Sequence, residues 1–182
     1  MKTFKVDKDI FLKEIALDDA EEIFKTIDSQ REYLGEWLPF VEKTKGIKDT
    51  EDFVNSVINE EEEKRELIIV IFYKDNFTGI IGFKDTDKEN KKTEIGYWLS
   101  EKYQKLGIIS RSLKVLLKHS FEEKGINRVQ IKCAVKNEKS IKIPKRLNFK
   151  FEGIERDGEL LSNNKFTDLE VYSLLKSEWK TN

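Results

Sequence analysis

A short polar loop separates a β-prone segment from a helical segment in the middle of the chain. Residues 104–109 read Gln-Lys-Leu-Gly-Ile-Ile and run directly into a stretch whose apolar residues repeat at helical spacing. The start of a helix presents unpaired backbone N–H groups and a partial positive charge. A glycine there lets the backbone approach a ligand closely. These residues indicate an anion site that suits a phosphate group, with an ordinary tight turn as the alternative.

The spacing of this loop excludes two common phosphate-binding motifs. It contains no G-x-G-x-x-G, and no G-K-[ST] follows it. The dinucleotide-binding fingerprint and the P-loop are therefore both ruled out.

Composition and charge bound the class of protein. At 182 residues we expect one domain, residues 1–182, and a formal net charge of −1 argues against a nucleic-acid surface. A single cysteine and a single histidine exclude an internal disulfide and argue against a zinc site, so no metal is expected. No apolar leader and no run of about 18 apolar residues is found, so we expect a cytoplasmic protein without a membrane span.

The segments around the loop predict a mixed α/β fold. Residues 94–99 are aromatic and β-prone, 67–73 and 78–83 suggest an antiparallel hairpin, and 128–135 alternate cleanly between apolar and polar. We also expect residues 4–16 to form an opening strand and a later helix to be capped by Thr50. The last two strands are expected at 151–153 and 166–175, with a polar loop over 155–165.

An aromatic cluster lies between the first helices. Residues 30–40 include Tyr33, Leu34, Trp37 and Leu38, and Gly35 and Pro39 oppose a long regular helix. One interpretation is a short helix that covers the core. The other is an apolar wall beside a substrate groove.

Two motifs together resemble a known family. Tyr-Gln-x-x-Gly-Ile-Ile follows Gly-Tyr-Trp-Leu, and Asn-x-x-Ser opens a later helix at residue 137. This is similar to the GCN5-related N-acetyltransferases (GNAT), especially the branch that acetylates the N-termini of ribosomal proteins. The resemblance implies a mostly antiparallel twisted sheet of about seven strands, with a parallel pair at the cofactor cleft and about four flanking helices. Ile109 and Lys105 depart from the usual glycine-rich form of the loop.

The resemblance also implies where acetyl-CoA would bind. Strand backbone near Trp98 and Leu99 would pair with the pantetheine arm, and Asn137 would contact that arm. The diphosphate would bind the loop and the start of the helix, which comprise Gln104, Lys105, Leu106, Gly107, Ile108, Ile109 and Ser110. Arg111 and Lys114 could meet outer phosphates or could be solvated helix charges. Leu34, Trp37 and Leu38 would border the acceptor.

Three residues are implied for the proton transfers of the reaction. Glu159 corresponds to a proposed base, and Ser140 to the residue proposed to protonate the departing thiolate. Glu94 lies on the strand where other members of the wider family carry a base. Either glutamate could instead be structural or a solvated surface carboxylate.

The resemblance implies an N-acetyltransferase whose acceptor is an amine. The first hypothesis is the N-terminal α-amino group of a ribosomal or other protein. A small amine such as a polyamine, amino acid or antibiotic is the second, and a non-catalytic acyl-CoA-binding module the third. A homodimer is one assembly that the resemblance allows.

Overall fold

The described chain folds around one eight-stranded sheet. The structure is a computed structural model that describes residues 1–162 and 164–180. Position 163 of the predicted 155–165 loop and positions 181 and 182 of the expected 1–182 domain lie outside the described residues. The strands follow the spatial order β1-β2-β3-β4-β5-β6-β8-β7. Their bounds are β1 Thr3–Lys5, β2 Ile10–Glu14, β3 Ile68–Tyr73, β4 Asn76–Asp87, β5 Lys92–Leu99, β6 Arg128–Ala134, β7 Lys150–Leu160 and β8 Phe166–Leu175.

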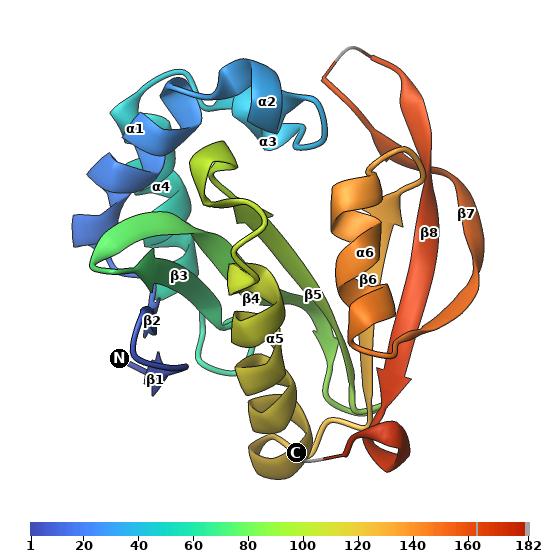
Figure 1. The fold of residues 1–182 in the computed structure, drawn as a ribbon. Helices are drawn as coiled ribbons and strands as arrows, with labels where there is room; N and C mark the ends of the chain where they lie inside the picture. The colour runs from blue at the N-terminus through green and yellow to red at the C-terminus, as the bar shows by residue number, and fades with distance from the viewer. Residues whose placement is uncertain (163, 181–182) are drawn as a thin grey trace.

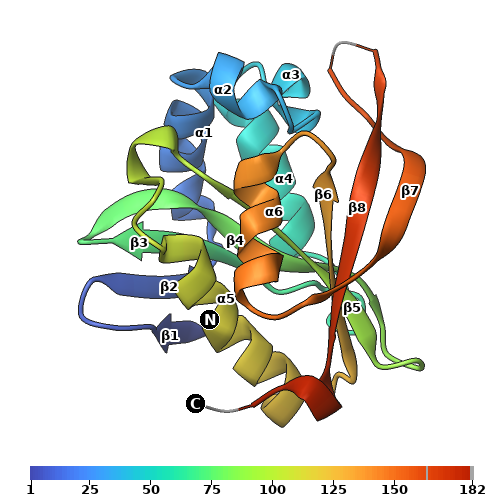
Figure 2. The same ribbon diagram turned by 45° about the vertical axis from the view of Figure 1, so that its right-hand side comes forward.

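Helices cover both faces of the sheet. They are α1 Ala20–Asp28, α2 Arg31–Gly35, α3 Phe40–Lys43, α4 Ile47–Ile58, α5 Ile108–Lys118 and α6 Glu138–Arg146. Figures 1 and 2 show α5 and α6 on one side of the sheet, α1 and α4 on the other, and α2 and α3 at one end. The predicted mixed architecture is confirmed, although the described residues form eight strands and six α-helices where about seven and about four were expected.

The alternation of apolar residues along the strands builds two separate cores. Ile95 and Ile131 pack with Leu113 and Leu116 of α5 on one face. Val70 and Ile80 pack with Val54 of α4 on the other face. Because successive strand residues point to opposite faces, one strand can contribute to both cores. Strand β5 does so, since Tyr97 packs against the first core and Trp98 against the second.

The parallel pair predicted at the cleft is present, and it is short. Every other pair of neighbouring strands is antiparallel, whereas β5 and β6 run parallel. Their register covers only Lys92–Glu94 against Arg128–Gln130. Both strands continue beyond these residues, β5 paired with β4 and β6 with β8. The sheet is therefore split between β5 and β6 along their carboxyl-terminal halves.

Helix α6 begins and ends as its sequence predicts. The Asn137 side chain accepts a hydrogen bond from the backbone N–H of Ser140 at 3.1 Å, which caps the first turn. Asn148 follows the helix in a left-handed conformation with φ of 61°. Asparagine tolerates that conformation better than most residues, so it can stop a helix where glycine is absent.

Three local predictions were wrong. Residues 4–16 form the β1–β2 hairpin and not a single strand, because the chain turns between Lys5 and Ile10. Helix α4 starts at Ile47, where Asp49 accepts bonds from the N–H groups of Lys45 and Gly46, so Thr50 lies buried inside the helix. Most of the predicted 155–165 loop belongs to β7, which continues to Leu160.

Candidate active site

A pocket of about 870 Å³ opens where β5 and β6 diverge. Its lining comes from α2, the end of β5, the loop before α5, and α6. Thirteen of the residues predicted from the sequence line it: Leu34, Trp37, Leu38, Trp98, Leu99, Gln104, Lys105, Gly107, Ile108, Ile109, Ser110, Asn137 and Ser140. Leu106, Glu94 and Glu159 are not among the lining residues. The fold thus gathers segments more than 100 residues apart around one cavity.

The loop before α5 has the backbone of an anion site. Gly107 is the N-cap residue of α5 and has φ of +70°, and within the described chain no side chain caps this helix. The first N–H groups of α5 have no intrahelical acceptor and are free to bind an external one. A Cβ at Gly107 would meet only Arg111 Nε, 3.9 Å away, so the approach to the backbone is open. Lys105 also adopts a left-handed conformation, with φ of 63°.

The split in the sheet supplies a second kind of binding surface. Beyond Glu94 and Gln130, the edges of β5 and β6 that face each other are not paired in the described register. Unpaired strand N–H and C=O groups are templates for an extended chain. A linear ligand with amide groups can therefore hydrogen-bond there while its anionic end reaches the start of α5.

Ser140 lies at the inner end of this gap, in contact with Tyr97 and Cys133. Its hydroxyl donates to the Tyr97 oxygen at 3.2 Å and lies 3.2 Å from Cys133 Sγ. The Tyr97 hydroxyl in turn donates to the Ser140 carbonyl at 3.2 Å. Burial raises the pKa of the Tyr97 phenol well above its usual value and raises the pKa of the Cys133 thiol to about 11. Both groups therefore stay protonated near neutral pH.

Helix α2 and the anion loop are joined through Tyr33. The Gln104 amide donates to the Tyr33 hydroxyl, and that hydroxyl donates to the Leu99 carbonyl at 3.3 Å. The short helix therefore does cover core, since Leu34 is buried, while Trp37 and Leu38 remain half-buried and border the pocket. The first interpretation of the aromatic cluster is met by Leu34, whereas contact of Leu34, Trp37 and Leu38 with a substrate stays a prediction.

Glu94 and Glu159 lie together on the opposite face of the sheet from Ser140. Glu94 is buried, with Lys84 Nζ at 2.8 Å from Oε1 and the Gln130 amide donating to Oε2 at 3.2 Å. Glu159 is half-buried on β7, opposite Thr167. Burial raises the pKa of Glu159, and the negative charge of Glu94 raises it further, whereas Lys84 and Lys132 oppose the shift. Of the two, Glu159 is the better suited to accept a proton, because the oxygens of Glu94 are already engaged.

Comparison with known proteins shows the family. Residues 9–150, which include the anion loop and the start of α6, match the family model described as the acetyltransferase (GNAT) domain. The chain belongs to the GNAT acetyltransferases. It is therefore an N-acetyltransferase by family, as the two sequence motifs indicated.

Two relatives span almost the whole chain. YdaF of Bacillus subtilis, whose assignment as a ribosomal N-acetyltransferase is provisional, is 36% identical over 182 residues, 99% of this chain and 98% of its own length. The ribosomal-protein-serine acetyltransferase of Escherichia coli is 29% identical over 172 residues, 94% of this chain and 96% of its own.

Two solved GNAT structures contain the cofactor. RimL, a ribosomal L7/L12 alpha-N-protein acetyltransferase in complex with coenzyme A, superposes with a TM-score of 0.91 at 25% identity, covering 97% of this chain and 99% of its own. MccE, the microcin C7 self-immunity acetyltransferase, is in complex with acetyl-CoA and AMP. Its TM-score is 0.88 at 29% identity, with 94% of this chain and 95% of its own covered.

Two features of this GNAT site were missed in the sequence. Tyr97 was named only within a strand, yet its position in β5 places its ring against Ser140 of α6. Arg146 ends α6 and lines the pocket, with Nη1 donating to Ser110 Oγ at 3.1 Å. Arg111, for which an outer phosphate contact and a solvated charge were both open, forms an ion pair with Asp7 and donates to the Leu106 carbonyl. Neither Tyr97 nor Arg146 carries a local signal in the sequence, because their partners, Ser140 and Ser110, lie on other elements.

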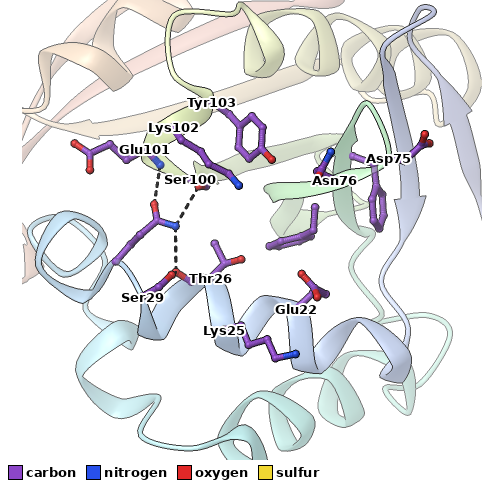
Figure 3. Close-up of a pocket in the computed structure, with 13 residues that line it drawn as sticks. Glu22, Lys25, Thr26, Ser29, Asp75, Asn76, Ser100, Glu101, Lys102 and Tyr103 are labelled. Carbon is purple, nitrogen blue, oxygen red and sulfur yellow. Dashed lines mark hydrogen bonds between the residues drawn. The ribbon is translucent and has the colours of Figure 1, made fainter.

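A second cavity of about 750 Å³ lies between α1, the β3–β4 turn and residues 101–103 (Figure 3). None of the sequence-predicted site residues lines it. Much of its polar lining is already paired, since the Gln30 side chain bonds both Ser100 Oγ and the Glu101 N–H. We therefore assign the chemistry to the pocket at the sheet gap.

The described residues contain no group of three or more histidine, cysteine, aspartate or glutamate side chains placed to hold a metal ion. Across the same residues, none of the helices is long and apolar enough to cross a membrane.

Proposed function

We propose that this enzyme transfers the acetyl group of acetyl-CoA to the N-terminal α-amino group of a protein, with ribosomal proteins as the first candidates. The observation that carries the proposal is the position of the sheet gap. The pocket at this gap extends from the start of α5 at Gly107, whose backbone N–H groups no described side chain caps, to the hydroxyl of Ser140. The L7/L12 acetyltransferase RimL, bound to coenzyme A, has this fold over nearly all of its length.

The proposal assigns each part of acetyl-CoA to a part of the chain. The diphosphate lies on the N–H groups that follow Gly107, where the helix dipole favours negative charge. The pantetheine arm lies along the free edge of β5 near Trp98 and Leu99, with Asn137 beside it. The thioester then lies near Ser140, and the acceptor enters past Leu34, Trp37 and Leu38.

The transfer needs two proton movements, which we place on opposite faces of the sheet. Glu159, directly or through water, accepts the proton that the amine loses as it attacks the thioester carbon. When the carbon–sulfur bond breaks, the Ser140 hydroxyl donates a proton to the departing thiolate. Tyr97 holds that hydroxyl in place and can return a proton to it. Glu94, fixed by Lys84 and Gln130, acts on Glu159 through its charge.

The pKa of the acceptor favours an α-amine. A free α-amino group has a pKa of ~8 and a lysine side chain ~10.4, so neutral lysine is scarcer by roughly 2.5 pH units, or ~3 kcal/mol. A glutamate, even one whose pKa is raised by burial, is a weak base that cannot readily offset this difference. A protein N-terminus meets the requirement, as do other amines of low pKa.

A second candidate is a small amine that carries a nucleotide-like group. Its support is the structural similarity to MccE, whose complex contains AMP beside acetyl-CoA. We place the enzyme in the cytoplasm and treat residues 1–182 as one domain, because the sheet continues from β1 to β8. Nucleic acid is not expected as a partner, and a homodimer stays a prediction.

An acceptor panel tests the proposal. Thiol release from acetyl-CoA is followed with peptides that begin with Ser, Ala or Thr, and with polyamines, amino acids and aminoacyl nucleotides. We expect release with the peptides, and far less with the Ser140→Ala variant. Release with small amines alone would transfer the assignment to the second candidate. Binding of acetyl-CoA without release to any acceptor would leave a non-catalytic acyl-CoA-binding module.

A further inference from the structure

A row of basic side chains follows α6 along the pocket. Lys139, Lys142 and Arg146 of α6 line it at the spacing that places helical residues on one face, as do Lys136, just before the helix, and Lys105, in the loop before α5. Among the described residues that line the pocket, only two are acidic, Glu36 and Glu138. The pocket therefore has an excess of three positive charges in a chain whose formal net charge is −1.

This excess is larger than a diphosphate requires. The N–H groups that follow Gly107 already offer a site for its two charges. Coenzyme A carries one more phosphate, a monoester on the 3′-hydroxyl of its ribose, with up to two further negative charges. If acetyl-CoA binds as the proposed function requires, some of the basic residues are available for this third phosphate.

The basic residues differ in how they are placed. Lys142 forms an ion pair with Glu138 at 3.5 Å, and Lys139 lies over the ring of Tyr33 in α2. Arg146 instead lies beside the first turn of α5, where its Nη1 donates to Ser110 Oγ at 3.1 Å. No carboxylate of the described chain lies within ion-pair distance of Arg146.

The geometry of Arg146 suits a phosphate monoester. A guanidinium group carries five N–H donors in a planar fork, and the bond to Ser110 uses one of them. That bond fixes the direction of the group, and the remaining donors can form paired bonds to phosphate oxygens. We propose that Arg146, oriented by Ser110, binds the 3′-phosphate of coenzyme A and makes this enzyme select acetyl-CoA over its 3′-dephosphorylated form.

Calorimetry with two nucleotides tests this inference. Coenzyme A and 3′-dephospho-coenzyme A are titrated into the wild type, into Arg146→Gln and into a matched control, Lys145→Gln. Lys145 is the neighbouring α6 cation, which lies over the Tyr172 ring and is not among the pocket residues. The melting temperature of each free variant checks that it is folded.

The wild type and Lys145→Gln should bind coenzyme A at least roughly tenfold more tightly than the dephosphorylated form, as expected for hydrogen bonds to a charged group. In Arg146→Gln this preference should fall to about threefold or less, with affinity for the dephosphorylated form unchanged. Equal weakening of both nucleotides would overturn the inference and place Arg146 on the diphosphate. A preference that survives in Arg146→Gln would also overturn it. If neither nucleotide binds the folded wild type, the proposed function itself fails.

Discussion

The Ser140 hydroxyl donates to the Tyr97 oxygen while the Tyr97 hydroxyl donates to the Ser140 carbonyl, both at 3.2 Å. This reciprocal pair joins β5 to the first turn of α6, the two elements on either side of the sheet gap. It holds the serine hydroxyl at the place where the proposed reaction releases a thiolate. In the proposed mechanism Tyr97 is therefore a positioning residue for the proton that Ser140 would supply.

The first prediction concerns this pair. Tyr97→Phe removes one hydroxyl and leaves the ring in place, so the serine loses its acceptor and samples other rotamers. We expect kcat to fall roughly tenfold in Tyr97→Phe. In Ser140→Ala we expect a fall of about a hundredfold, which is the low end of the range for general acid–base catalysis. The KM for acetyl-CoA should stay within about twofold. Steady-state kinetics at saturating peptide measures both constants.

Tyr103→Phe is the matched control for Tyr97→Phe. Tyr103 packs against Tyr73 and lines the second cavity, away from Ser140. Its variant should retain wild-type kinetics. Wild-type kcat in Tyr97→Phe would show that the hydroxyl pair has no part in the reaction.

The second prediction is the pH dependence set by Glu159. A base must be deprotonated to act, so kcat should fall as the pH decreases through the pKa of Glu159, which burial raises above the usual range for glutamate. Glu159→Gln should lower kcat and abolish this acidic limb while leaving acetyl-CoA affinity nearly intact. A pH–rate profile for both proteins measures this, and an unchanged profile in the variant would exclude Glu159 as the base.

The neighbours of Glu159 predict shifts of opposite sign. Glu94 raises the pKa of Glu159 and Lys84 lowers it. The acidic limb should therefore move to lower pH in Glu94→Gln and to higher pH in Lys84→Gln. Movement of both limbs in the same direction would contradict this electrostatic arrangement.

The third prediction separates backbone strain from phosphate binding at Gly107. Its φ of +70° costs a non-glycine residue about 1 kcal/mol, but a Cβ there meets only Arg111 Nε, at an ordinary contact distance of 3.9 Å. Gly107→Ala should thus lower stability slightly and keep acetyl-CoA binding within about tenfold. Gly107→Glu places a negative charge beside the diphosphate and should abolish binding. Calorimetry with acetyl-CoA measures the affinity of both variants. An unchanged affinity of Gly107→Glu for acetyl-CoA would show that the diphosphate does not bind this loop.

The fourth prediction concerns stability in acid. Arg128 Nη1 donates to Glu152 at 2.6 Å, and this bond lowers the pKa of Glu152 to about 2. The bond stabilises the folded protein fully above about pH 4.3, the pKa of a glutamate in the unfolded chain, and this stabilisation is lost as the pH falls toward 2. With solvent screening of this partly exposed pair taken into account, Glu152→Gln should cost about 0.5–1 kcal/mol at pH 7. Denaturant unfolding should show that the free energies of unfolding of the wild type and Glu152→Gln differ at pH 7 and converge at pH 2. An equal difference in this free energy at both pH values would contradict the prediction.

Much of the fold could be predicted because it follows from local patterns. Alternation of apolar residues in 128–135 and the asparagines that flank α6 act through neighbouring residues alone. Thr50 shows the limit of that approach. A threonine beside an apolar stretch has the features of a cap, but Asp49 bonds to the N–H groups of Lys45 and Gly46 and starts α4 earlier.

The site was predicted less completely, for a different physical reason. Gly107, Asn137 and Ser140 belong to motifs that are continuous in the sequence. Tyr97 and Arg146 derive their placement from partners 43 and 36 residues away, Ser140 and Ser110. Such pairs depend on how β5, α5 and α6 pack, which no local spacing encodes. Glu159 was predicted in a loop, and only the pairing of β7 with β8 fixes its position near Glu94.

The most direct measurement of the central claim uses one peptide that offers both kinds of amine. A peptide with a free N-terminal serine and one internal lysine is incubated with enzyme and acetyl-CoA, and tandem mass spectrometry locates the acetyl group. We predict a single acetyl group on the N-terminal nitrogen, at a rate that falls in Ser140→Ala. Acetylation of the lysine side chain instead, or of neither amine by an enzyme that acetylates small amines, would contradict the account.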